Sequence, residues 1–240
     1  MVSFHRFKKK ITLDDAVKRL QDGYNENLVA VILYGSAATA DYVEGYSDHN
    51  LLAVVKESAI PDLRRDAWVV DWVRQGNPSP VFFTERQIMD SLDTFPVEFL
   101  DMKDSRKLLF GKDVLAGAAV DTKHLRHQIE HDLRSKCLAL RSAYVADARR
   151  KGDLSRLMVE SSSSFMVLFR HLLRLFGDTP PADKAAVLTA LVKRAGFNRA
   201  VFEEVLTARA RKVKVLPDED LLFAKYVGSV ESIIEAVDKL

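Results

Sequence analysis

The first half of the chain alternates short apolar runs with segments of helical periodicity. Four runs rich in β-branched and aromatic residues predict strands, and three stretches with apolar positions at helical spacing lie between them. Thr12 and Thr84 precede two of these stretches and are favourable N-cap residues. The predicted strands cover residues 28–34, 50–55, 79–84 and 96–102, and the predicted helices cover residues 13–22, 59–75 and 84–92. Strands separated by helices indicate a sheet with helices packed on it.

The second half of the chain carries only helical patterns. Apolar positions recur every three to four residues after Gly117, and glycine and proline interrupt them. The predicted helices cover residues 121–150, 153–176, 182–195, 199–210 and 218–239. A segment of small residues, 113–121, separates the two halves. We therefore expect an α+β protein with an α/β domain over residues 1–118 and a helical bundle over residues 119–240.

The composition is that of an ordinary folded protein. The chain has 240 residues, of which 48% are hydrophobic and 29% are charged, and this excludes collagen-like, low-complexity and disordered classes. No stretch approaches the ~20 apolar residues of a membrane span, and the basic N-terminus lacks the apolar core of a signal peptide. We expect a cytoplasmic protein with no membrane partner. A lone cysteine, Cys137, excludes an intrachain disulfide and any CxxC motif, and we interpret it as a buried helix residue.

Charge is distributed unevenly along the chain. The formal net charge is +2, but residues 1–120 carry −3 and residues 121–240 carry +5. The small total argues against a protein that coats nucleic acid, so nucleic acid is not an expected partner. The basic run at residues 209–214 has no aromatic residues interleaved for base stacking. We interpret it as a solvated helix end, where cations interact favourably with the helix dipole.

The most informative segment is residues 33–55, LYGSAATADYVEGYSDHNLLAVV. An apolar strand runs into Gly35 and Ser36, and a second strand opens at Asp48. Gly35 lacks a Cβ, so a phosphate can approach the backbone closely, and Ser36 offers a hydroxyl and a backbone N–H to an anion. Positions 48 and 50 of a strand share one face. Asp48 and Asn50 therefore present two oxygen donors of the kind that hold Mg²⁺ against a triphosphate.

This segment resembles the signature of the nucleotidyltransferase superfamily, which includes DNA polymerase beta and the kanamycin nucleotidyltransferases. That signature is Gly-Ser, a spacer (here of eleven residues), Asp-x-Asp at the head of a strand, and a third carboxylate on a later strand. The resemblance implies a mixed sheet followed by a helical bundle. It also implies transfer of a nucleoside monophosphate from an NTP to a hydroxyl of a small molecule or a protein, with Mg²⁺ or Mn²⁺. Gly35, Ser36 and Asn50 would bind the nucleotide, and Asp48 with Asn50 would bind the metal.

The third carboxylate of the signature is expected on the predicted strand at residues 96–102. Alternation places Glu98 on the face opposite Val97 and Phe99. Glu98 is therefore the first choice for the third metal ligand, and for the second catalytic carboxylate after Asp48. Asp101, on the other face, is the second choice. A merely solvent-facing Glu98 stays open as an alternative.

Two departures from the signature leave two hypotheses open. The second acid of the pair is Asn50, whose amide oxygen can coordinate Mg²⁺ but brings no negative charge. Thr39 and Ala40 stand where many members have Arg-Gly. One hypothesis, which we favour, is a working enzyme with a weaker second metal site. The other is a degenerate nucleotide-binding or antitoxin-like regulatory module that binds a helical partner protein. Homodimerisation is left open.

Several histidines have the spacing of metal ligands, but we do not interpret them as a metal site. Residues 127–131 match the HxxEH arrangement of some zinc peptidases. Arg126 and His131 also fit an Arg-x4-His pattern of helical-bundle ribonucleases. We interpret this stretch as a solvated helix face. His49 faces away from its neighbours at positions 48 and 50, so we expect it to pack or to lie at the surface.

Overall fold

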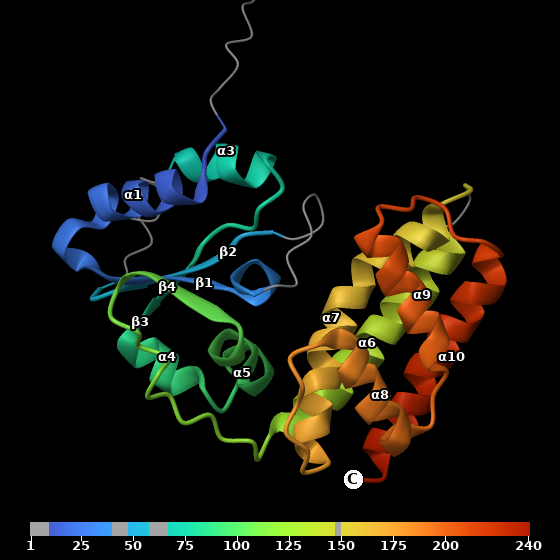
Figure 1. Ribbon diagram of the computed structural model, residues 1–240. Coiled ribbons are helices and arrows are strands. Elements are labelled where there is room, and N and C mark those ends of the chain that lie inside the picture. The colour runs from blue at the N-terminus through green and yellow to red at the C-terminus, as the bar shows by residue number, and fades with distance from the viewer. Residues whose placement is uncertain (1–9, 40–47, 58–66, 147–149) are drawn as a thin grey trace, which may run out of the picture. The chain divides into compact units, whose positions relative to one another are not determined.

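The computed structural model (Figure 1) describes residues 10–39, 48–57, 67–146 and 150–240. By its internal contacts the chain divides into two compact units: Met1–Leu92 with Asp101–Ala119, and Asp93–Leu100 with Val120–Leu240. The first unit contains the sheet and the second is helical. The boundary after residue 118 stays a prediction, and this division assigns the short segment 93–100 to the helical unit.

The first unit is built on a four-stranded mixed sheet. Its strands are β1 (Leu28–Tyr34), β2 (Asn50–Val55), β3 (Val81–Thr84) and β4 (Arg106–Gly111). They are ordered β3-β2-β1-β4, with β1 antiparallel to both neighbours and β2 parallel to β3. The predicted strands at residues 28–34 and 50–55 are confirmed at both ends. The mixed sheet confirms the expected α+β fold class.

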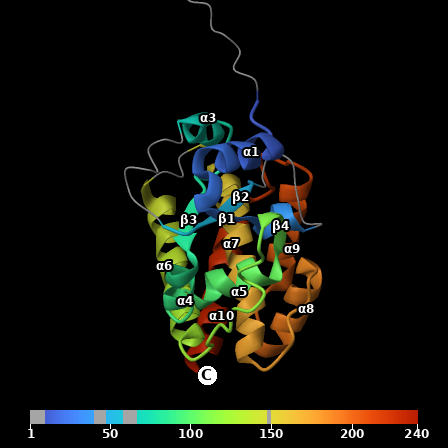
Figure 2. The same ribbon diagram turned by 90° about the vertical axis from the view of Figure 1, so that its left-hand side faces the viewer.

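Both faces of the sheet are covered. Helices α1 (Leu13–Tyr24) and α3 (Trp68–Arg74) lie on one side of it and α4 (Glu85–Ser91) on the other (Figures 1 and 2). The core beneath α1 and α3 takes from the strands Val31, Leu33, Leu51, Ala53 and Val55. The intervening residues are fully buried as well: Ala30, Ile32, Leu52 and Val54. Burial on both sides explains why β1 and β2 are continuously apolar.

Two predicted helix starts are confirmed by their hydrogen bonds. The Thr12 hydroxyl accepts the backbone N–H of Asp15 at 3.1 Å, and the Asp15 carboxylate accepts the Thr12 N–H at 3.0 Å. Thr84 and Gln87 make the same reciprocal pair at 3.1 and 2.8 Å. Each pair satisfies two backbone donors that a helix start would leave unpaired. The helix predicted over residues 59–75 is observed as α3, and its first part lies outside the described residues.

The main correction concerns the strand predicted over residues 96–102, which is wrong. This segment forms helix α5 (Pro96–Asp104). Proline is well suited to a first helical position, because its missing N–H would have no partner there in any case. The buried apolar residues of α5 lie three apart in two pairs, as on one side of a helix: Val97 with Leu100, and Phe99 with Met102. The strand that completes the sheet is β4, which the sequence patterns did not indicate.

The second unit confirms the predicted bundle. Within the described residues it contains α6 (Leu125–Ala146), α7 (Asp153–Leu175), α8 (Lys184–Ala195), α9 (Arg199–Ala210) and α10 (Glu219–Asp238). Helix α7 packs against each of the other four. Aromatic rings fill the centre, with Phe202 at 5.0 Å from Phe169 and 4.7 Å from Tyr226 between ring centroids. None of the helices formed by the described residues combines the length and the apolar character needed to cross a membrane.

Candidate functional site

Strand β1 ends in a tight turn at Gly35, the first residue of the short 3₁₀ helix η2 (Gly35–Ala38). Gly35 has φ +75°, a conformation that favours glycine. Its N–H donates to the carbonyl of Ser105 at 2.9 Å. A Cβ at position 35 would lie 3.3 Å from Nδ2 of Asn50. The turn thus lies directly against the first residue of β2, with Ser36 half-buried beside it.

Asp48 and Asn50 stand at the start of β2. Asn50 is the first residue of the strand and pairs with Tyr34, the last residue of β1. Asp48 is exposed and makes no hydrogen bond or ion pair to any described residue. No described residue therefore occupies its carboxylate. The structure brings together the turn at Gly35 and the amide of Asn50, as the sequence motif predicts.

Tyr34 connects this turn to a second carboxylate. Burial raises the pKa of the Tyr34 hydroxyl, and the negative charge of Asp101 raises it further. Asp101 therefore lies within electrostatic reach of the residue that precedes Gly35. The carbonyl of Asp101 also accepts the N–H of Ser105 at 2.9 Å, and the carbonyl of Ser105 in turn holds the N–H of Gly35. Asp101 belongs to the same unit as Asn50.

An ion pair that the sequence did not indicate lies at the start of β4, next to the last residue of β1. Arg106 pairs with Tyr34 in the β1–β4 ladder. Its Nε donates to both oxygens of Asp113 at 3.2 and 3.0 Å, and its Nη2 donates to one of them at 2.9 Å. Its Nη1 donates to the carbonyl of Lys103. These hydrogen bonds hold the pKa of Asp113 below its usual range. The pair joins the end of α5 to the loop that follows β4.

Glu98 is placed in the helical unit. Its exposed carboxylate accepts a hydrogen bond from Nε2 of Gln128 at 2.6 Å, and Oε1 of Gln128 accepts the backbone N–H of Val97 at 3.0 Å. These bonds connect the first turn of α5 to α6. The expected strand position of Glu98 is wrong because residues 96–104 are helical. Its role as the third carboxylate stays a prediction.

The remaining histidine expectations concern His49, His127 and His131. His49 donates its N–H to Oδ1 of Asn77 at 3.0 Å, and its ring centroid lies 5.9 Å from that of Trp72, so this residue packs. His127 and His131 are exposed on α6. They belong to no group of three or more histidine, cysteine, aspartate or glutamate residues that could hold a metal, since no such group occurs among the described residues.

The chemistry of the donors at β2 nevertheless fits a substrate-bound divalent cation. Mg²⁺ usually binds one or two carboxylates together with phosphate oxygens and water, rather than a cage made only of protein. Asp48 offers an exposed carboxylate that pairs with no residue in the described ranges, and Asn50 offers an amide oxygen two residues later. At the turn, the lack of a Cβ on Gly35 lets the backbone lie against the Asn50 amide, which a side chain would crowd.

A mixed sheet with its Gly-Ser turn, followed by a helical bundle, defines the nucleotidyltransferase fold, and this chain has that fold. Among solved structures, it is similar to spectinomycin adenyltransferase AAD(9) from Enterococcus faecialis, determined with ATP and spectinomycin. The similarity covers 94% of this chain and 98% of that chain, with a TM-score of 0.58 and 13% sequence identity. At this identity the likeness concerns the fold. No protein-family model matches the sequence, and no curated protein is significantly similar to it.

Proposed function

We propose that this protein is a nucleotidyltransferase that moves a nucleoside monophosphate from an NTP to a hydroxyl of a small molecule. The observation that carries the proposal is the contact between the Gly35 turn and Asn50, two residues after Asp48, whose carboxylate pairs with no described residue. A fold shared with an adenyltransferase determined with ATP and a small-molecule ligand supports the same substrate classes here. A fold alone does not determine an activity, so the proposed transfer depends on the residues of this site.

The two residues of the turn have different roles in this proposal. The N–H of Gly35 is already donated to Ser105, so it is not available to a phosphate. Gly35 instead supplies the left-handed turn and the close approach of the backbone to the Asn50 amide. The hydroxyl of Ser36, the next residue, is the polar group that would contact the phosphate. A variant at position 36 should therefore weaken nucleotide binding without straining the backbone.

Asp48 and Asn50 would hold a divalent cation, Mg²⁺ or Mn²⁺, together with the phosphates of the nucleotide. Such a cation supplies neutralisation of the negative charge on the triphosphate. A carboxylate is also needed to accept the proton of the attacking hydroxyl. We assign this role to Asp101, because it lies in the same unit as Asp48 and acts on Tyr34. Glu98, the first choice from the sequence, is the alternative.

The test is release of pyrophosphate when the protein is mixed with each NTP, Mg²⁺ or Mn²⁺, and a panel of hydroxyl-rich acceptors that includes spectinomycin. The expected result is acceptor-dependent release that is lost in Asp48→Ala and kept in Glu26→Ala, an exposed carboxylate of the same unit. Comparing Asp101→Asn with Glu98→Gln identifies the proton acceptor, since only one of them should abolish turnover. Equal activity of Asp48→Ala and the wild type would refute the proposed site.

A second candidate function is favoured by the neutral side chain of Asn50. Without a second carboxylate the site holds less negative charge than two cations require. A degenerate module would bind the NTP but not release pyrophosphate. In that case Asn50→Asp, which restores the missing charge, should show turnover that the wild type lacks. Binding without turnover in the wild type, with turnover in Asn50→Asp, would replace the enzyme proposal with this one.

A further inference from the structure

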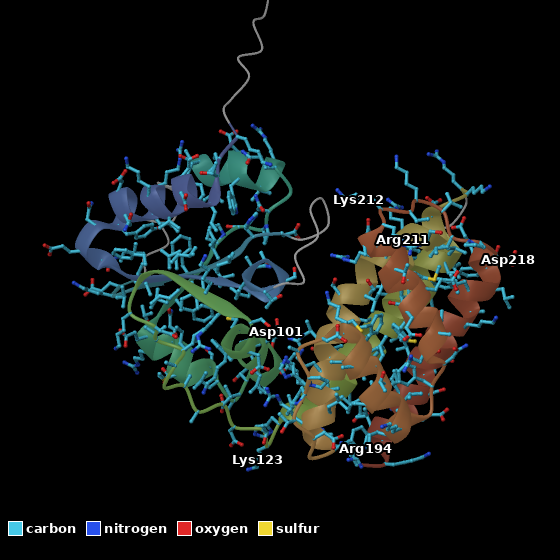
Figure 3. All side chains as sticks on the ribbon, in the orientation of Figure 1. Asp101, Lys123, Arg194, Arg211, Lys212 and Asp218 are labelled. Carbon is cyan, nitrogen blue, oxygen red and sulfur yellow. The ribbon has the colours of Figure 1, made fainter. Side chains whose placement is uncertain are left out.

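Two segments that are distant in the sequence meet at one end of the helical bundle. Residues 150–152 precede α7, and residues 211–217 connect α9 to α10. A Cβ at Gly152 would lie 3.3 Å from both the carbonyl oxygen of Lys214 and a methyl group of Val215. Figure 3 shows Arg211 and Lys212 at this end of the bundle, while Lys123 and Arg194 lie towards the opposite end.

Buried hydrogen bonds fix the two segments to each other. The hydroxyl of Ser155, a fully buried residue, accepts the backbone N–H of Leu216 at 2.8 Å. The carboxylate of Glu219 accepts the N–H of Gly152 at 2.8 Å and the N–H of Ser155 at 3.0 Å. One acid from the start of α10 therefore caps the start of α7. The surface made by both segments is held by contacts inside the protein and does not depend on a ligand to assemble it.

This surface carries a set of cations that we call the basic end: Arg150, Lys151, Arg211, Lys212 and Lys214. All five side chains are exposed, and none of them forms an ion pair with any part of the chain that the structure describes. Residues 150–156 and 209–220 together contain seven lysines or arginines and four acids. Three of the four acids have partners, since Glu219 caps α7, Asp220 accepts from Tyr144, and Asp153 pairs with Arg156; the fourth, Asp218, is exposed.

We propose that the basic end binds the phosphate backbone of duplex nucleic acid without reading its sequence. Unpaired lysine and arginine side chains on a fixed surface are the groups that contact phosphates. Residues 150–152 and 211–217 contain no aromatic side chain, so the surface lacks the stacking platforms that single strands require. The net charge of the whole chain did not indicate this surface, because α7, α8 and α9 separate its two segments in the sequence. This proposal departs from the sequence-based expectation that nucleic acid is not a partner.

The test is fluorescence anisotropy of a labelled short DNA duplex of arbitrary sequence, measured without NTP or metal and therefore independent of any transfer activity. The test variant replaces Arg211, Lys212 and Lys214 by glutamine. The control replaces Lys123, Lys193 and Lys239 by glutamine, which removes the same charge from exposed residues of the same unit. A second test variant, Arg150→Gln with Lys151→Gln, probes the other segment. Circular dichroism of each variant checks that the bundle is folded.

Five phosphate contacts give a salt slope of about −4.5, so the affinity should fall about 500-fold between about 50 and 200 mM salt. With two contacts left in the triple test variant, the fall should be only about 12-fold. The control triple should keep the wild-type slope. The proposal is overturned by equal slopes for the two triple variants or by no duplex binding at about 50 mM salt. Tighter binding of a single strand, of polyglutamate or of phosphatidylserine vesicles than of the duplex would also overturn it.

Discussion

Replacing Gly35 by alanine tests whether the turn is the strained, close-packed element described above. Alanine at φ +75° pays about 1–2 kcal/mol for the left-handed conformation. The new Cβ would also lie 3.3 Å from Nδ2 of Asn50, so that amide must move by a few tenths of an ångström. Gly76→Ala is a matched control: it has φ +94° and nothing within 4 Å of the new Cβ, so it carries the backbone strain alone.

Urea unfolding followed by tryptophan fluorescence measures this effect in the correct unit. Both tryptophans of the chain, Trp68 and Trp72, are buried in α3 beside the sheet. Gly76→Ala should lose about 1–2 kcal/mol of unfolding free energy, and Gly35→Ala should lose at least as much because it also crowds Asn50. Only Gly35→Ala should also weaken NTP binding. The dissociation constant of the NTP should rise about tenfold for each 1.4 kcal/mol of binding free energy that is lost. Wild-type stability of Gly35→Ala, or an equal loss of NTP affinity in both variants, would refute the assignment of the turn.

Three further outcomes are expected. Asp113→Asn should destabilise the first unit by about 1–2 kcal/mol near neutral pH, because Arg106 loses its charged acceptor. Because the pKa of Asp113 is lowered in the folded state, the extra stability of the wild type over the variant should be present above about pH 3.9. It should disappear as the pH falls through the lower pKa of the folded state. Urea titrations that show the same pH dependence for variant and wild type would contradict this. Phe202→Ala, at a fully buried position, should cost about 3–5 kcal/mol by circular dichroism, whereas Leu138→Ala, 60% exposed, should cost under about 0.5 kcal/mol; similar losses would show that the aromatic cluster is not the centre of the bundle. Asp48→Ala should change stability by less than about 0.5 kcal/mol while it abolishes pyrophosphate release, and a large stability loss would mean that Asp48 has a structural role.

The sequence was most informative where one local pattern had one structural meaning. The continuous apolar runs of β1 and β2 have the short length and the β-branched residues that favour strands over helices. Capping at Thr12 and Thr84 depends on residues three positions apart, so it is also readable locally. The contact of Gly35 with Asn50 follows from the same motif, because adjacent antiparallel strands bring the end of β1 to the start of β2.

Helix α5 shows where local patterns are ambiguous. Val97 and Phe99 alternate as in a strand, whereas Leu100 and Met102 follow them at the three-residue spacing of a helix. The discriminating signal was Pro96 at the first helical position. The misassignment moved Glu98 onto a strand and hid β4, the edge strand whose Leu108 is exposed. The Arg106–Asp113 pair was hidden with it.

The basic end could not be predicted from the sequence for a different reason. Its two segments meet only because α7 to α10 pack as a bundle, and the contact between Gly152 and Lys214 depends on a tertiary arrangement. Charges that come together through packing are invisible to a count along the chain. The same holds for the effect of Asp101 on Tyr34, which requires that the end of α5 leads back to β1 through Ser105.

The most direct test of the proposed activity is the mass of the acceptor after incubation with the protein, an NTP and Mg²⁺. The expected product is an acceptor heavier by one nucleoside monophosphate less one water. It should form with the wild-type protein and with Gly76→Ala, and it should be missing with Asp48→Ala. Modified acceptor formed equally by Asp48→Ala would contradict the site at the start of β2. No modified acceptor from the wild type, while the NTP binds, would contradict nucleotidyl transfer itself.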